Sequence, residues 1–185
     1  MSVGDKKNNH VKVGGCASIN SLTSNKAVEA FMQCNTSETW CNKMAQARPF
    51  SDCQSVFETA DEIWAESKEK DLLQAFEGHP EIGDVSTLRE KYRNTEKLAG
   101  HEQSGVNTAN ENTLQSLAQG NKDYKKKFGF IFIVCASGKS ADKMLALLLA
   151  RLPNSREQEL VNAAEEQRKI TQIRLHNLLE SYKND

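Results

Sequence analysis

The sequence predicts an all-α protein, a single-domain helical bundle that holds one buried extended segment at about residues 130–135. Apolar residues recur at helical spacing from about residue 24 to the end of the chain. Serines that can act as N-caps, among them Ser37, Ser140 and Ser155, precede several of these stretches. The run Phe130–Cys135 has the composition of a buried strand, but no other run can pair with it. Because a lone strand does not make a sheet, we expect it to be extended or irregular within a helical protein.

The length, composition, net charge and cysteine pattern of the chain limit the class of protein. A length of 185 residues fits one domain with a substantial core, and 38% hydrophobic with 26% charged residues is typical of a helical, water-soluble protein. The net charge of −1 supplies no field that would attract nucleic acid or a membrane surface, and no apolar run is long enough to span a bilayer. The five cysteines form no CxxC pair, so we expect reduced thiols in the cytoplasm.

The chain divides into a tail and a domain. Residues 1–18 are rich in Gly, Asn, Lys and Ser without an apolar period, and we expect a mobile N-terminal tail there. The helical domain then covers residues 19–185, with its first helix beginning near Ser24. Further helices are expected after Ser37 and after Ser51, each an N-cap candidate.

A candidate proton-transfer residue follows the helix expected over residues 71–76. Gly78 is expected to close that helix in a left-handed turn, and Pro80 cannot continue it, so His79 is held in a narrow backbone range. The carbonyl end of the helix and the flanking glutamates favour the imidazolium form. A rigidly held imidazole suits proton transfer, whereas an ordinary surface turn that contains a histidine is the simpler interpretation of the local pattern.

Polar residues interrupt the apolar stripe of the final helix. At 100° per residue, Gln167 and Arg174 fall on the same side as the leucines of that helix. An inward arginine needs an anionic partner, which is either an internal carboxylate such as Glu102 or an acidic group of a ligand. Glu102 lies near a helix start, where carboxylates are common because they complement the helix dipole. Together, Gln167 and Arg174 indicate a polar pocket floored by this helix.

Two apparent motifs fail on spacing. His101 and Glu102 begin a zinc-protease pattern, but position 105 is Gly where the second histidine is required, so we expect no metal site. Gly138-Lys139-Ser140 resembles the end of a phosphate-binding loop, but the required first glycine would fall at Ile133. The buried segment nearby would lack ladder partners for its backbone, which must then bind a ligand or be satisfied by side chains.

Several stretches occur in order along the chain: Arg48-Pro49-Phe50, His79-Pro80-Glu81-Ile82-Gly83, Glu102-Gln103, residues 127–133 and residues 163–175. Taken together, they resemble the 2-oxo-4-hydroxy-4-carboxy-5-ureidoimidazoline (OHCU) decarboxylase family over roughly residues 19–180. Each stretch alone is weak, but the ordered set is specific. Two positions depart from the family: Ala99 replaces the usual Ser, and Ile131 stands where many members have Pro.

The resemblance implies a cofactor-free, all-helical and usually dimeric carboxy-lyase that converts OHCU to (S)-allantoin in urate degradation. It implies catalytic roles for His79 and Glu102, and substrate binding by Pro80, Gln103, Phe130, Ile131, Phe132, Ile133, Val134 and Arg174. We therefore expect a small-molecule substrate, a homodimer, no metal or cofactor, and no nucleic-acid or membrane partner. The alternative is a non-enzymatic helical interaction module, which explains the amphipathic helices but not an inward Gln and Arg beside a buried unpaired segment.

Overall fold

The computed structural model describes residues 14–81, 84–99 and 107–182, with the backbone alone at positions 93–99 and 107–110. Among these residues there are nine α-helices and no strand, as the sequence predicts. The helices are Gly15–Ser21 (α1), Ser24–Met32 (α2), Glu38–Gln46 (α3), Cys53–Ala65 (α4), Glu69–Glu77 (α5), Val85–Ala99 (α6), Asn107–Phe128 (α7), Ala141–Arg151 (α8) and Arg156–Ser181 (α9).

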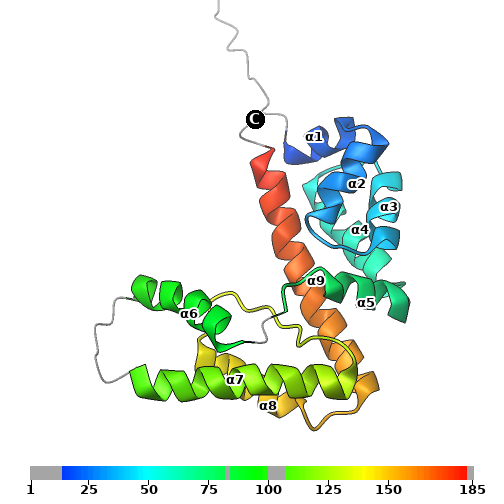
Figure 1. Ribbon diagram of the computed structural model, residues 1–185. Helices are drawn as coiled ribbons and strands as arrows, with labels where there is room; N and C mark the ends of the chain where they lie inside the picture. Colours follow the sequence, from blue (N-terminus) through cyan, green and yellow to red (C-terminus); the bar gives the residue numbers. More distant parts are fainter. Residues whose placement is uncertain (1–13, 82–83, 100–106, 183–185) are drawn as a thin grey trace, which may run out of the picture.

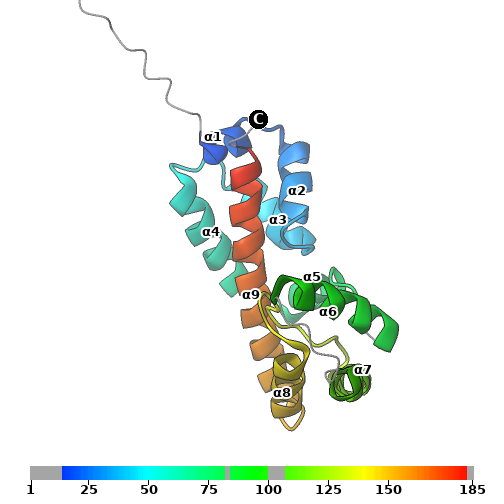
Figure 2. The same ribbon diagram turned by 90° about the vertical axis from the view of Figure 1, so that its left-hand side faces the viewer.

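The long helix α9, orange to red in Figure 1, is the axis of the molecule. Helices α1–α4 pack along its C-terminal half, and α5–α8 gather around its N-terminal half, as the view turned by 90° also shows (Figure 2). The largest apolar core lies between α1–α4 and three leucines of α9, Leu175, Leu178 and Leu179. Two smaller apolar clusters stabilise the other half, one within α6–α8 and one where α5, α7 and α9 meet the extended segment.

The first helix begins earlier than expected. Helix α1 starts at Gly15, so residues 15–18 are helical rather than part of a tail, and Cys16 and Ile19 are buried. A Cβ at Gly15 would lie 2.0 Å from the carbonyl oxygen of Leu179, so glycine lets α1 lie directly against α9. With only 7 residues, α1 is too short for its apolar positions to show a period.

The predicted caps are mostly confirmed. The side chains of Ser37, Ser140 and Ser155 each accept a hydrogen bond from a backbone N–H in the first turn of the helix that follows. The cap of α4 is one residue later than expected, because Asp52 rather than Ser51 accepts from the backbone. A carboxylate is the stronger acceptor of the two, and it also complements the helix dipole.

The buried extended segment is confirmed. After α7 the chain runs without helix or strand through residues 129–140. Arg151 Nη1 donates to the carbonyl oxygen of Ile133 at 2.7 Å, and Glu166 Oε2 accepts from the amide of Cys135 at 2.7 Å. Lys139 Nζ donates to the carbonyl of Cys135, also at 2.7 Å. Side chains therefore replace the ladder partners that a neighbouring strand would supply.

A buried polar cluster holds this segment against α9. Glu159 is fully buried and accepts hydrogen bonds from the Tyr124 hydroxyl, Arg151 Nε, Asn154 and Asn162. We call these five residues the Glu159 network. Burial alone would raise the pKa of Glu159, but the bonds donated by Tyr124, Asn154, Asn162 and Arg151 hold it below its ordinary value. The carboxylate therefore stays ionised and neutralises Arg151, whose guanidinium carbon also lies 4.8 Å from the ring centroid of Phe132.

Candidate active site

The end of α5 is clamped by the connection between α2 and α3. Thr36 Oγ1 donates to the carbonyl oxygens of Gln74 and Ala75, at 3.0 Å and 3.3 Å. A Cβ at Gly78 would lie only 2.1 Å from Thr36 Oγ1, so glycine is needed for close packing. The expectation of a left-handed Gly78 is wrong, because its φ is −69°. The contact that requires glycine comes from 42 positions earlier in the chain, which no local pattern reveals.

His79, directly after this clamp, joins a line of buried polar side chains. Its Nε2 lies 2.6 Å from Gln167 Oε1, and Gln167 Nε2 donates to Thr171 Oγ1 at 3.2 Å. Asn35 Nδ2 donates to the same hydroxyl at 3.3 Å. Gln167, Thr171 and Asn35 are all at least 96% buried. Because the Gln167 nitrogen faces Thr171, its oxygen faces the imidazole, and Nε2 of the neutral ring carries the proton.

The ring of His79 is held neutral. Burial lowers the pKa of His79, the positive charge of Arg174 lowers it further, and the hydrogen bond to Gln167 only partly offsets both. The expectation of a favoured imidazolium is therefore wrong. The flanking Glu81 does not counter this, because it forms an ion pair with Lys125 Nζ at 2.7 Å. A neutral imidazole has one nitrogen with a free lone pair, which can accept a proton.

Arg174 lies two turns beyond Gln167 on the same face of α9. Its Nη1 donates to the carbonyl oxygen of Cys34 at 3.4 Å, and it forms no ion pair with any carboxylate in the described part of the chain. The guanidinium is half-buried and lines a pocket. A charge of this kind needs an anion or several oxygen acceptors, and the described residues do not provide them.

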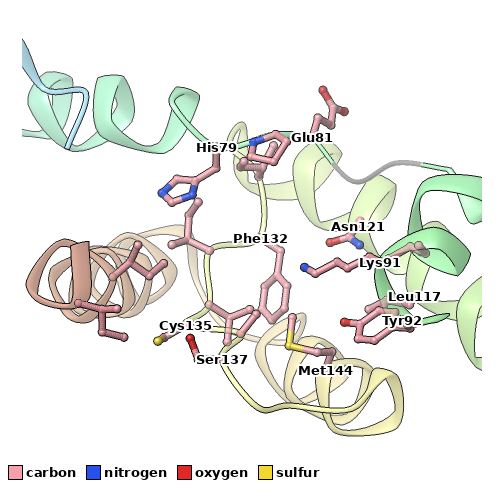
Figure 3. A pocket seen from close by; sticks show the side chains of 18 of the residues that line it. His79, Glu81, Lys91, Tyr92, Leu117, Asn121, Phe132, Cys135, Ser137 and Met144 are labelled. Carbon is pink, nitrogen blue, oxygen red and sulfur yellow. The ribbon is translucent and has the colours of Figure 1, made fainter. Parts of the chain in front are cut away.

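The structure brings together seven of the ten predicted site residues around one pocket of about 330 Å³. They are His79, Pro80, Ile131, Phe132, Ile133, Val134 and Arg174. Among the described residues, the backbone groups of Ile131, Phe132 and Val134 find no hydrogen-bond partner, so they remain available to a ligand. The pocket lies where the two smaller apolar clusters meet, and Figure 3 shows the side chain of Phe132 at its centre.

One described residue of the predicted site does not line this pocket. Phe130 is 5% exposed and packs its ring against Phe76 and Tyr124, with ring centroids 5.4 Å and 6.0 Å away. Its side chain belongs to the core, where α5 and α7 both pack against it. Because these contacts come from other parts of the chain, the local sequence does not reveal them. Glu102 and Gln103 lie outside the described residues.

The sequence interpretation missed several pocket residues. Gln167 was expected to face inward, but not to bond His79. Lys91, Tyr92 and Asn121 also line the pocket, from α6 and α7. The spacing of Tyr92 to Leu88 signals burial of its ring, but it carries no information about where the hydroxyl points.

Fold and site together define an all-α protein whose pocket sets a neutral imidazole beside a guanidinium that has no carboxylate partner among the described residues. Such a pocket suits a small, oxygen-rich ligand that exchanges a proton with the protein. No group of three or more potential metal-ligating side chains occurs in the described ranges, and none of the helices there is long and apolar enough to cross a membrane.

The family follows from comparison with known proteins. The family model described as OHCU decarboxylase matches residues 20–176, which is most of the chain. This protein belongs to the OHCU decarboxylase family, as the resemblance in its sequence indicates. The matched region includes every residue that we assign to the pocket from α5 to α9.

Two curated relatives and one solved structure illustrate the similarity. The uric acid degradation bifunctional protein TTL of Arabidopsis thaliana is 36% identical over 146 residues, which are 78% of this chain but 44% of that protein. The 2-oxo-4-hydroxy-4-carboxy-5-ureidoimidazoline decarboxylase of Haloferax volcanii is 23% identical over 158 residues, 85% of this chain and 91% of that protein. This chain thus spans less than half of the bifunctional relative.

A crystal structure of OHCU decarboxylase in the presence of (S)-allantoin is 36% identical in sequence and superimposes with a TM-score of 0.64. The match covers 81% of this chain and 96% of that one. The similarity therefore extends over nearly the whole of that solved chain.

Proposed function

We propose that this chain decarboxylates 2-oxo-4-hydroxy-4-carboxy-5-ureidoimidazoline to (S)-allantoin. Membership of the family supports this reaction, and so do the names of the relatives. The structural observation that carries it is the neutral imidazole of His79, bonded to buried Gln167 and facing the same pocket as Arg174. An interaction module would have no need of a tuned imidazole beside a guanidinium that lacks a carboxylate partner in the described part of the chain.

The substrate carries a carboxylate and a hydroxyl on one carbon, next to an imine carbon. When the bond to the carboxylate breaks, CO₂ leaves and the electron pair moves into the imine, whose nitrogen takes up a proton. The neighbouring carbon is then protonated on one face, and the hydroxyl loses its proton to become a carbonyl. The substrate's own imine accepts the electrons, so the protein has to orient the breaking bond and transfer a proton.

His79 is the residue that we assign to proton transfer. Its Nε2 proton is engaged by Gln167, so Nδ1 is the nitrogen that takes the hydroxyl proton and returns it to carbon. A positioned acid–base group of this kind typically contributes about 10²–10⁴-fold to the rate. Because the ring is neutral at the start, it can act first as a base.

The remaining roles concern binding. Arg174 holds carboxylate or ring oxygens, and the backbone of Ile131–Val134 bonds the polar edge of the ligand. Pro80 contacts the ring beside His79. By resemblance, Glu102 fixes the ring by hydrogen bonds and Gln103 helps to orient the ureido group, which stays a prediction of the sequence.

The direct test feeds the purified chain with the hydrolysis product of hydroxyisourate and follows the circular dichroism of allantoin. We expect faster formation of allantoin and a single enantiomer. An interaction module would leave the rate and the product handedness of the uncatalysed reaction unchanged, and that result would refute the proposed function.

A homodimer and a cytoplasmic location are also proposals, which rest on the family resemblance and on the scattered cysteines. Light scattering of the purified full chain tests the first, with a mass of twice 20.7 kDa expected. A mass of one chain at micromolar concentration would contradict it. Localisation of the tagged full chain in cells tests the second, and a signal confined to an organelle would contradict it.

A further inference from the structure

The pocket has a second polar group of side chains on the far side of Phe132 from His79. Figure 3 shows Lys91, Tyr92 and Asn121 there, with the Tyr92 hydroxyl and the Lys91 ammonium turned toward the middle of the pocket. Lys91 and Tyr92 come from α6, and Asn121 comes from α7. Neither the family match nor the sequence motifs assign a role to these three residues.

The Tyr92 hydroxyl is the unusual member. Tyr92 is 5% exposed, and its hydroxyl is the one buried side-chain polar atom in the described part of the chain that has no hydrogen-bond partner. A buried hydroxyl without a partner carries a free-energy penalty, because folding removed its water without replacement. A phenylalanine would fill the same space without that penalty. The hydroxyl is therefore better explained by a partner that arrives with the ligand.

The chemistry of the group defines what it binds. Burial raises the pKa of Tyr92, so the hydroxyl keeps its proton and donates a hydrogen bond. Lys91 is a donor only, and its Nζ lies 5.8 Å from the Tyr92 ring centroid. Asn121 is half-buried, and its amide has no hydrogen-bond partner within the described ranges. The one described carboxylate that lines the pocket, Glu81, is paired with Lys125. The unpaired Tyr92 hydroxyl and the Asn121 amide can therefore donate to a ligand oxygen beside the Lys91 ammonium.

We propose that Tyr92, with Lys91 and Asn121, forms a second binding subsite that holds a carbonyl or carboxylate oxygen of the ligand. The ligand is then held at two ends, by His79 and Arg174 on one side of Phe132 and by this donor group on the other. Two-ended binding fixes the orientation of a small ring, which a reaction that protonates one face of a carbon requires. This proposal deepens the proposed function and rests on it, because the proposed function identifies the substrate. Binding of allantoin at the subsite can be measured whether or not the chain decarboxylates that substrate.

The test compares two substitutions that each delete one oxygen atom. Tyr92→Phe removes the unpaired hydroxyl, whereas Tyr124→Phe removes a hydroxyl bonded to Glu159 and Arg151. In chemical unfolding, we expect the midpoint of Tyr92→Phe to stay at or above that of the wild type. We expect the midpoint of Tyr124→Phe to fall. This contrast separates a binding role of Tyr92 from a structural one.

Binding of (S)-allantoin by calorimetry then locates the oxygen. A loss of about 3–10-fold in affinity in Tyr92→Phe, the range for one hydrogen bond, means that the subsite binds a carbonyl that substrate and product share. Unchanged allantoin affinity with a similar rise in KM for the substrate means that it binds the carboxylate. Both results support the subsite. Unchanged Kd and unchanged KM would overturn it.

A second variant and the wild type complete the test. Asn121→Asp places a negative charge in the subsite, so we expect weaker ligand binding, and tighter binding would overturn the assignment. Wild-type protein that binds allantoin in a Tyr92-dependent way without decarboxylating the substrate would refute the proposed function and support the subsite. Full decarboxylase activity, with no effect of Tyr92→Phe on binding or turnover, would support the proposed function and overturn the subsite.

Discussion

Two arginines near the extended segment illustrate two different uses of buried charge. Arg151 belongs to the Glu159 network, where its guanidinium bonds Glu159 at 2.7 Å, the carbonyl of Ile133 at 2.7 Å and the Tyr124 hydroxyl at 3.1 Å. Arg174 has one long bond, at 3.4 Å, to the carbonyl of Cys34. Of the two, only Arg151 has a carboxylate partner among the described residues.

The difference separates a structural polar network from a functional one, and both networks include residues of α9. The Glu159 network satisfies its own polar groups, so it fixes the backbone of residues 130–135 and needs nothing from outside. The line from Asn35 through Thr171 and Gln167 to His79 is closed at its buried end and open at the pocket. The free lone pair of His79 and the N–H groups of Arg174 that lack acceptors among the described residues are therefore available to bind a ligand.

The largest expected effect comes from substitution of His79, at the pocket end of the line of polar side chains. His79→Asn removes the proton-transfer group, so we expect kcat to fall by about 10²–10⁴-fold. His176→Asn, at an exposed histidine of α9, is the matched control and should leave kcat unchanged. The measurement is initial rate by circular dichroism, with the free energy of unfolding measured in parallel. Near-normal turnover in His79→Asn would refute the assignment of His79.

The closed network should affect stability instead. Glu159→Gln leaves Arg151 as a buried charge without its counterion, so we expect the free energy of unfolding to fall by about 3–5 kcal/mol. Glu165→Gln breaks an exposed pair with Arg168 on the same helix and should cost less than about 1 kcal/mol. Both are measured by urea unfolding at pH 7.

The same network predicts the pH dependence of stability. The folded pKa of Glu159 is depressed, so its contribution is present above the unfolded pKa of about 4.3 and is lost as the pH falls through the folded pKa. Glu159→Gln should remove this part of the acid sensitivity. Equal stability of wild type and Glu159→Gln at pH 7 would contradict the structural role of the network.

Arg174 should show the opposite pattern to Glu159. Arg174→Lys keeps the charge but loses the planar fork, so we expect kcat/KM to fall roughly 10–100-fold, the value of one charge-assisted hydrogen bond. Arg168→Lys, at a half-buried, ion-paired arginine one to two turns away, is the control and should retain activity. Unfolding curves should coincide for all three proteins. If Arg174→Lys were fully active but destabilised, Arg174 would belong with Arg151 as a structural residue.

The smallest expected change is a shift of the pH profile. The base must be neutral, so kcat/KM falls as the pH drops through the pKa of His79, which lies below 6.5. Gln167→Glu places a carboxylate 2.6 Å from Nε2 and stabilises the imidazolium, so the acid limb should move up by about one pH unit or more. A limb that stays in place would show that Gln167 does not tune His79.

Local patterns in the sequence were sufficient for the helices other than α1, for three of the caps and for the extended segment. Ser37, Ser140 and Ser155 act within one turn of themselves, so their role is legible from spacing alone. The composition of residues 130–135, combined with the lack of a pairing partner, was enough to predict their backbone. The inward positions of Gln167 and Arg174 followed from helical periodicity.

Features that depend on distant contacts were not predictable. Gly78 is required by Thr36, and the neutral state of His79 results from burial beneath α9 and from the charge of Arg174. The resemblance implies that the backbone of Phe130 binds the ligand, which stays a prediction, whereas the packing of its ring in the core was not predicted. The unpaired hydroxyl of Tyr92 appears only when the packing of α6 against α7 and α8 is known.

The measurement that tests the account most directly is an NMR titration of His79 in the full chain, with the signal assigned by its absence in His79→Asn. We predict a pKa below 6.5, with the proton of the neutral ring on Nε2, and a shift of the His79 signals when (S)-allantoin is added. A pKa at or above 6.5, together with no response to (S)-allantoin, would contradict a neutral imidazole at a ligand-binding site.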